Sequence, residues 1–324
     1  MMEKPEDFAA FQALSARLGQ DPLQVQGPGG NTSIKDGPVM WIKASGTELA
    51  AAETGDIFVA VDREAARAEA RREAGDGSCK TTILDPEIKL RPSIETTFHA
   101  ALDWPVVAHT HSIATLVHVA SPEGRLLADQ KLAGLPFVRV PYAKPGLPLT
   151  DQILAAATPE TQIVLLENHG LLCCGASVAE TGAILAEVET RLEMSARQTF
   201  YPGPATAAPD GFSWSAHGVL ACHARSFELA ISGSYYPDHV VFLGPALPQT
   251  DHDGARPVLL IEGQGAAIRN GATSSQNAML RCLADLMLRL PEDWTLEAIG
   301  AEAEAELLDW DAEKYRQALA ARSQ

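Results

Sequence analysis

Three histidines in this chain stand at or near the ends of apolar runs, where they could supply the ligands of a metal ion. His109 and His111 follow the run Val106–Ala108, and His169 comes shortly after a second apolar run. Side chains two residues apart on a strand point to the same face, so the first two imidazoles would converge. A carboxylate, Glu95, lies a short way upstream. Three neutral imidazoles and a carboxylate suit a catalytic divalent metal, so the pattern predicts an enzyme that uses a Lewis acid.

Each of these residues also has a purely structural interpretation. The two neighbouring histidines could be polar residues that merely end a strand. Glu95 lies near the start of a helix expected over Ser93–Leu102, where a glutamate complements the helix dipole. His99, one turn further on, is either a partner that orients a site residue or a histidine packed for structural reasons.

Two loops have the composition of an anion-binding site. The segment Gly27–Ser33 is dense in glycine, and glycines such as Gly30 let the backbone approach a ligand closely. Asn31 and Thr32 add short-range donors. The loop lacks the Gly-Lys-Ser/Thr ending of a Walker loop. A second loop, Ala44–Thr47, follows the next predicted strand.

Composition excludes several classes of function. The 324 residues include 42 acidic and 25 basic side chains, a formal net charge of −17 that argues against nucleic acid as a partner. The five cysteines are scattered without a Cys-x-x-Cys pair, which argues against a disulfide framework and a thiolate zinc site. We see no secretory signal and no run of about 20 apolar residues, so we expect a cytoplasmic protein with no membrane partner.

Alternating helix and strand patterns predict an α/β layered domain that ends near residue 200. Helices are predicted at 7–18, 63–73, 93–102, 113–120, 151–157 and 178–198, and strands at 39–43, 58–61, 106–109, 137–140 and 161–166. After a linker at 202–212 come a helix at 216–232, strands at 240–243 and 257–261, a helix at 274–290 and an acidic helical tail. The sequence thus predicts a catalytic domain over residues 1–203 and a smaller C-terminal α+β extension over 204–324.

Five short motifs occur in the order found in the class II aldolase/adducin family. They are Gly-Gly-Asn-Thr-Ser at 29–33, Lys-Ala-Ser-Gly at 43–46, Arg-Pro-Ser-Ile-Glu at 91–95, His-Thr-His-Ser at 109–112 and Asn-His-Gly at 168–170. The chain resembles this family over about residues 5–200, most closely the aldolase part of rhamnulose-1-phosphate aldolase/dehydrogenase proteins. The resemblance implies a three-layer α/β/α class II aldolase-like domain around a central sheet.

The resemblance also implies roles for individual residues. Zn²⁺, or alternatively Mn²⁺ or Co²⁺, would be bound by His109, His111 and His169, and Glu95 would be the catalytic glutamate. The family's phosphate-binding positions fall on Asn31, Ser45, Gly46 and Ser93, beside Gly30 and Thr32 in the glycine-rich loop. Tyr142 lies in a stretch similar to the one that carries a catalytic tyrosine in fuculose-phosphate aldolase.

One position departs from the family pattern. Where fuculose-phosphate aldolase has a second serine before the glutamate, this chain has Ile94. The change removes one hydroxyl donor and alters the expected phosphate recognition. Lys43 either compensates for this loss or faces solvent.

The function implied is a zinc-dependent aldolase that cleaves a ketose phosphate, of the rhamnulose-1-phosphate or fuculose-1-phosphate type, to dihydroxyacetone phosphate and an aldehyde. Glu95 would move the proton at the nascent carbanion carbon, and Tyr142 would exchange a proton with the aldehyde oxygen. Family members commonly form homo-oligomers, often tetramers. The alternatives are a sugar-phosphate 4-epimerase, which typically has aspartate in place of Glu95, a decarboxylase, a dehydratase, or a non-catalytic adducin-like binding module that has lost the histidines.

Overall fold

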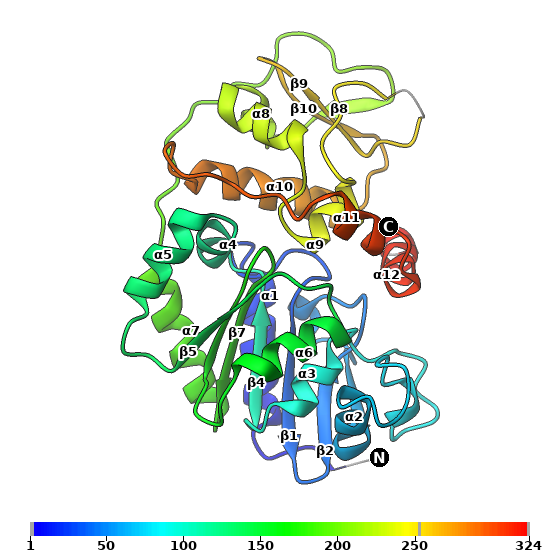
Figure 1. Cartoon of the computed structure of the whole chain (residues 1–324). Coiled ribbons are helices and arrows are strands. Elements are labelled where there is room, and N and C mark those ends of the chain that lie inside the picture. Colours follow the sequence, from blue (N-terminus) through cyan, green and yellow to red (C-terminus); the bar gives the residue numbers. More distant parts are fainter. Residues whose placement is uncertain (1–2, 252–253, 323–324) are drawn as a thin grey trace.

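A seven-stranded sheet forms the centre of the computed structural model, which describes residues 3–251 and 254–322 (Figure 1). The strand order is β3-β2-β1-β4-β7-β6-β5, and every neighbouring pair is antiparallel except β5 and β6. The strands are β1 Asn31–Asp36, β2 Val39–Lys43, β3 Phe58–Asp62, β4 Val106–Thr110, β5 Phe137–Val140, β6 Ile163–Leu166 and β7 Gly170–Gly175.

Both faces of this sheet are buried, and this makes the domain a three-layer α/β/α structure. Along β4, Val106 and Ala108 belong to the hydrophobic cluster on one face, and Val107 belongs to a cluster on the other. The first face packs against α1 Phe8–Gln20, α4 Ile113–Val119 and α7 Val178–Leu192. The second packs against α2 Arg63–Ala70, α3 Thr96–Ala101 and α6 Leu147–Ala156. The layered α/β fold expected from the sequence is therefore confirmed.

The C-terminal part of the chain has its own three-stranded sheet, in the order β8-β10-β9, and lies over one end of the large sheet (Figure 1). Its strands are β8 Phe212–Trp214, β9 Val258–Ile261 and β10 Gly265–Arg269. Its helices are α8 Ala224–Ser232, α9 Pro237–Leu243, α10 Ser274–Arg289, α11 Ala301–Leu308 and α12 Asp311–Arg322, and α5 Pro122–Lys131 completes the N-terminal part. No helix in the described ranges is both long and apolar enough to cross a membrane.

One predicted element of the C-terminal part is wrong in type. The apolar run 240–243, expected as a strand, belongs to the helix α9, which has Pro237 at its start. Every residue of α9 is buried, so no polar face marks a helical period, and a short apolar run is ambiguous by pattern alone. The proline at the first helical turn is the signal that favours the helix.

Other elements differ from their predictions in their bounds. The helix expected over 216–232 is broken into a short 3₁₀ segment, Gly218–Ala221, and α8. The helices expected over 63–73 and 178–198 end earlier, at Ala70 and Leu192. The helix expected from Ser93 begins at Thr96, so Glu95 is its N-cap residue and makes no side-chain cap bond. The strands β1, β7, β8 and β10 were not expected from the sequence.

Two buried histidines make the stability of this fold depend on pH. The Nδ1 of His118 donates to the carbonyl of Ala114 at 2.8 Å, and His239 lies beside Tyr235 and Tyr236. Burial lowers the pKa of His118 to about 4 and that of His239 to about 3. Below about pH 6.5 these two histidines therefore bind protons in the unfolded chain, while in the folded chain they stay neutral until the pH is lower still.

We expect the free energy of unfolding in urea to fall between pH 7 and pH 5 by roughly 2 kcal/mol for each of these histidines. In His118→Gln, which keeps a polar side chain but cannot take up this proton, the decrease should be smaller by about that amount. Equal pH dependence in the two proteins would contradict the assignment to His118.

Candidate metal centre

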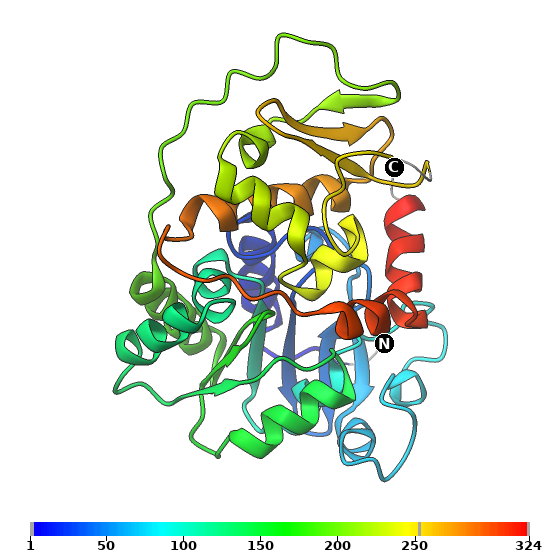
Figure 2. The same ribbon diagram turned by 45° about the horizontal axis from the view of Figure 1, so that its top comes forward.

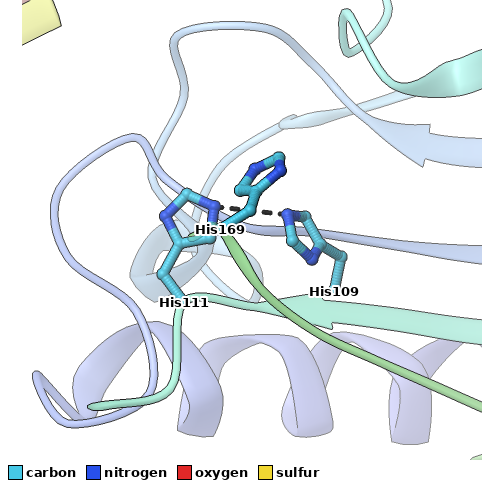
Figure 3. Close-up of side chains that lie close together, drawn as sticks. All are labelled: His109, His111 and His169. Atoms are coloured by element: carbon cyan, nitrogen blue, oxygen red, sulfur yellow. Dashed lines mark hydrogen bonds between the residues drawn. The ribbon is translucent and has the colours of Figure 1, made fainter. Parts of the chain in front are cut away.

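Three imidazoles converge beside the end of β4 and the turn between β6 and β7 (Figure 3). His109 lies in β4, His111 follows the end of β4, and His169 lies in the turn between β6 and β7. One ring nitrogen from each lies within 4.8 Å of the others, and the Nε2 atoms of His109 and His111 are 3.2 Å apart. All three side chains are buried, so this cluster could bind a metal ion.

The other ring nitrogens of two of these histidines are held by acceptors. The Nδ1 of His109 donates to the carbonyl oxygen of Leu171 at 3.0 Å, because a carbonyl can only accept. The Nδ1 of His111 lies 3.3 Å from Oδ2 of Asp238, in α9. Both contacts favour the tautomer with the proton on Nδ1 and leave an Nε2 lone pair directed to the centre of the cluster.

The site also favours neutral imidazoles. Burial lowers the pKa of His109, although Glu95 opposes the shift, and burial together with the other two histidines lowers the pKa of His169 well below its ordinary value. A neutral imidazole is the form that binds metal, so no proton has to be displaced from either ring at neutral pH.

Glu95 completes the donor set. Its Oε2 lies 3.4 Å from Nε2 of His109, and its Oε1 lies 3.6 Å from Nε2 of His169. Within the described residues, Oε1 of Glu95 is buried without a hydrogen-bond partner. Buried polar atoms of this kind need a partner, so the residues present fit a divalent cation at their centre.

A hydrogen-bonded chain fixes the position of Glu95. The amide nitrogen of Asn31 donates to its Oε2 at 2.7 Å, and the amide oxygen of Asn31 accepts from Nε2 of His99. The Nδ1 of His99 then accepts from the hydroxyl of Ser33 at 2.7 Å. His99 is fully buried and is also connected to Glu95 through Asn31, so it is packed in the core and helps to orient a residue of the site. In this structure Asn31 uses its amide to hold the carboxylate.

Backbone geometry explains two of the sequence motifs. Asn168 has a left-handed backbone with φ of +51°, and its side-chain amide donates to the carbonyls of Tyr235 and Glu297 in the C-terminal part, at 3.2 and 2.7 Å. This turn directs His169 into the cluster. In the glycine-rich loop, a Cβ at Gly29 would lie 2.8 Å from both Nδ1 of His111 and Oδ2 of Asp238. A side chain there would displace the histidine, so the loop packs directly on His111 and Asp238.

Most of the predicted phosphate positions lie around one narrow cavity beside the histidines. Gly30, Asn31, Ser45, Gly46 and Ser93 line it, together with Glu95, His111 and His169. The hydroxyl of Ser93 accepts from the backbone N–H of Glu95 at 3.2 Å. The side chain of Thr32 is not brought to this cavity, because its hydroxyl is paired with Ser15 of α1 at 2.7 Å.

Tyr142 lies apart from the histidines within one chain. It is half-buried beside the C-terminal helices, and burial, with Glu306 and Glu313 adding to it, raises its pKa well above the ordinary value. Its hydroxyl has no hydrogen-bond partner among the described residues. Tyr142 is therefore protonated at any physiological pH, as an acid must be, but no contact links it to Glu95.

Four charged residues around the cavity have roles that the sequence did not reveal. Lys43 does not face solvent: its ammonium donates to the carbonyl of Pro28 at 2.9 Å, and burial lowers its pKa to about 7. Asp238, Glu313 and Arg316 come from the C-terminal part and line the same cavity. Arg316 is 2.9 Å from Asp238 and 2.8 Å from Glu313. No local motif marks these three residues, which reach the site through the docking of α9 and α12.

We expect Asp238→Asn to weaken zinc binding by about 10- to 100-fold, because the neutral amide orients His111 less strongly. Competition with a chromophoric chelator at pH 7 measures this affinity. Asp285→Asn, which removes a carboxylate paired with Arg289 on α10, is the matched control and should bind zinc like the unmodified chain. Equal affinities for Asp238→Asn and the control would contradict the orienting role.

Known proteins resemble the N-terminal part of this chain in sequence and fold. Residues 10–196 match the family described as "Class II Aldolase and Adducin N-terminal domain". The Bacillus subtilis (strain 168) protein named "Uncharacterized oxidoreductase YuxG" is 33% identical over 179 residues, which make up 49% of this chain. The match covers 25% of YuxG, so the chain spans about a quarter of that relative's length.

Among solved structures, the N-terminal class II aldolase domain of a conserved protein from Thermoplasma acidophilum is 25% identical, with a TM-score of 0.52. The likeness covers 59% of this chain and 94% of that domain. An L-fuculose 1-phosphate aldolase is 21% identical over 59% of this chain and 85% of its own, with a TM-score of 0.41, a likeness too low to bear on the substrate. The match over residues 10–196 covers more than half of the sequence, and the chain belongs to the class II aldolase and adducin family.

Proposed function

We propose that this protein is a zinc-dependent aldolase that cleaves a ketose phosphate of the rhamnulose-1-phosphate or fuculose-1-phosphate type to dihydroxyacetone phosphate and an aldehyde. The observation that supports it most is the cluster of three buried histidines within 4.8 Å, with a carboxylate in contact with two of them. A binding module without chemistry would not need this donor set.

The metal would be held by His109, His111 and His169. Three nitrogen ligands with room for a fourth suit zinc, and Mn²⁺ or Co²⁺ could occupy the same site. A bound divalent cation supplies positive charge that stabilises the negative charge left on substrate oxygens when the carbon–carbon bond breaks.

Glu95 would move the proton at the reacting carbon. Asn31 fixes one of its oxygens, while Oε1, which has no hydrogen-bond partner in the described part of the chain, would leave the cation as substrate binds and accept the proton. We keep Tyr142 as the acid for the aldehyde oxygen, acting on a neighbouring subunit of a homo-oligomer, because no contact joins it to Glu95 within one chain.

The phosphate of the substrate would bind at the narrow cavity. Ser45, Gly46 and Ser93 line it, and Lys43 adds a buried ammonium where Ile94 has removed a hydroxyl. We also propose that residues 1–203 form the catalytic domain and 204–324 an extension, and that the protein is cytoplasmic, since its cysteines are free.

Glu95→Gln should keep its zinc but lose turnover by about 100-fold or more, because the amide cannot accept the proton. Zinc-loaded proteins are offered rhamnulose-1-phosphate and fuculose-1-phosphate, and dihydroxyacetone phosphate is measured with a coupled reductase. Glu292→Gln, an exposed change, should leave the rate as it is. A fully active Glu95→Gln variant would show that Glu95 has no role in the mechanism. If the sugar is epimerised and not cleaved, the protein is an epimerase and the aldolase assignment is wrong.

A further inference from the structure

The cavity beside the histidines is too small for the substrate proposed for it. Its free volume is about 30 Å³, room for about one water molecule. Pockets that bind small molecules are roughly 300–1,000 Å³. Part of the surrounding structure must therefore move before a sugar phosphate can reach the histidines.

The helix α12 separates this narrow cavity from a wide one. Beside it lies a second cavity of about 740 Å³, and Ser45, Ile94 and Pro145 line both. Two residues of α12, Glu313 and Arg316, line the narrow cavity. Other residues of the same helix, such as Ala312 and Tyr315, line the wide cavity. Figures 1 and 2 both show α12, in red, at the edge of the molecule beside the cyan segment that follows α2. Displacement of this helix would join the two cavities.

The face by which α12 docks is unusual because much of it is charged. Glu313 and Arg316, one turn apart, are buried, whereas a docked surface helix ordinarily buries apolar residues at such positions. Leu319 packs on Gly46, so that a Cβ added to Gly46 would lie only 2.5 Å from Cδ1 of Leu319. In the wall of the wide cavity, the guanidinium of Arg91 stacks on the ring of Tyr315, 3.9 Å from the ring centre. Arg316 joins α12 to α9 through its 2.9 Å ion pair with Asp238, whereas its pair with Glu313 lies within α12 and does not hold the helix in place.

Arg316 binds two carboxylates that differ in how firmly they are held. Asp238 is fixed from its other side by His111. Both carboxylate oxygens of Glu313 accept hydrogen bonds from Nη1 of Arg316, at 3.0 and 2.8 Å. Burial raises the pKa of Glu313 to about 7 despite Arg316, so its ionised form is held there at a cost in free energy. Glu313 is the replaceable partner.

We propose that Arg316 is a substrate-binding residue, and that the phosphate group of the substrate displaces Glu313 from its guanidinium as α12 moves. A guanidinium can bind phosphate through two parallel N–H donors, whereas in this structure Glu313 and Asp238 both contact the single nitrogen Nη1 of Arg316. Lys43 lines the same cavity and adds a second cation to this phosphate site. This inference rests on the proposed sugar-phosphate substrate.

Inorganic phosphate is the probe, titrated calorimetrically into the full-length chain. Glu313→Gln should bind it about 10-fold more tightly than the unmodified chain, because the competing carboxylate is gone. Arg316→Lys keeps the positive charge beside Asp238, which protects the fold, but loses the paired geometry and should bind phosphate several-fold more weakly. Lys89→Gln, which removes one charge from an exposed side chain that lines neither cavity, should bind phosphate like the unmodified chain.

Unchanged affinity in both Glu313→Gln and Arg316→Lys would overturn the inference, as would an equal loss in Lys89→Gln, which would indicate a general charge effect. The proposed function fails separately. If the phosphate affinities change as expected but no ketose phosphate is cleaved, the aldolase assignment is wrong and the phosphate site stands. If cleavage occurs with unchanged phosphate affinities, Arg316 has no part in phosphate binding.

Discussion

The burial of three imidazoles against one another and against Glu95 is the constraint on which the rest of the site depends. Burying polar groups is unfavourable unless each finds a partner. Here the carbonyl of Leu171 accepts from Nδ1 of His109, Oδ2 of Asp238 lies 3.3 Å from Nδ1 of His111, and Asn31 donates to one oxygen of Glu95. The nitrogens and the oxygen that remain face a common centre, where a divalent cation would satisfy them together.

The antiparallel pairing of the large sheet produces this convergence. Asn31 of β1 pairs directly with His109 of β4, so the residue that holds Glu95 lies next to a metal ligand. On the other side of β4, Leu171 of β7 lies opposite Thr110, which brings its carbonyl to the ring of His109. A shift of one residue in either register would point His109 to the opposite face of the sheet.

Side chains of the C-terminal part contact both the histidine cluster and the turn that carries His169. Asp238 touches His111, Arg316 touches Asp238, and the side chain of Asn168 spans from the His169 turn to two carbonyls of the C-terminal part. Loss of this docking would leave His111 without its acceptor and the Asn168 turn without its anchors. The catalytic chemistry proposed for residues 1–203 therefore depends on side chains from 204–324.

The sequence predicted the parts of the site that local patterns carry. Apolar runs located β4 and β6, and the ordered motifs located the three histidines and Glu95. The contribution of Asp238 and Arg316 could not be predicted, because it arises from docking between segments more than 100 residues apart and has no local signal. The role of Asn31 as the holder of Glu95 was hidden for a related reason: it depends on the β1–β4 pairing, and β1 was expected to be a loop.

Metal analysis of the purified chain tests the central claim most directly. After loading with zinc and removal of excess, mass spectrometry of the intact protein should find about one zinc ion per chain, and far less in a folded His109→Ala, His169→Ala double variant. A chain that retains no zinc, manganese or cobalt under these conditions, or a double variant that retains as much as the unmodified chain, would contradict the account.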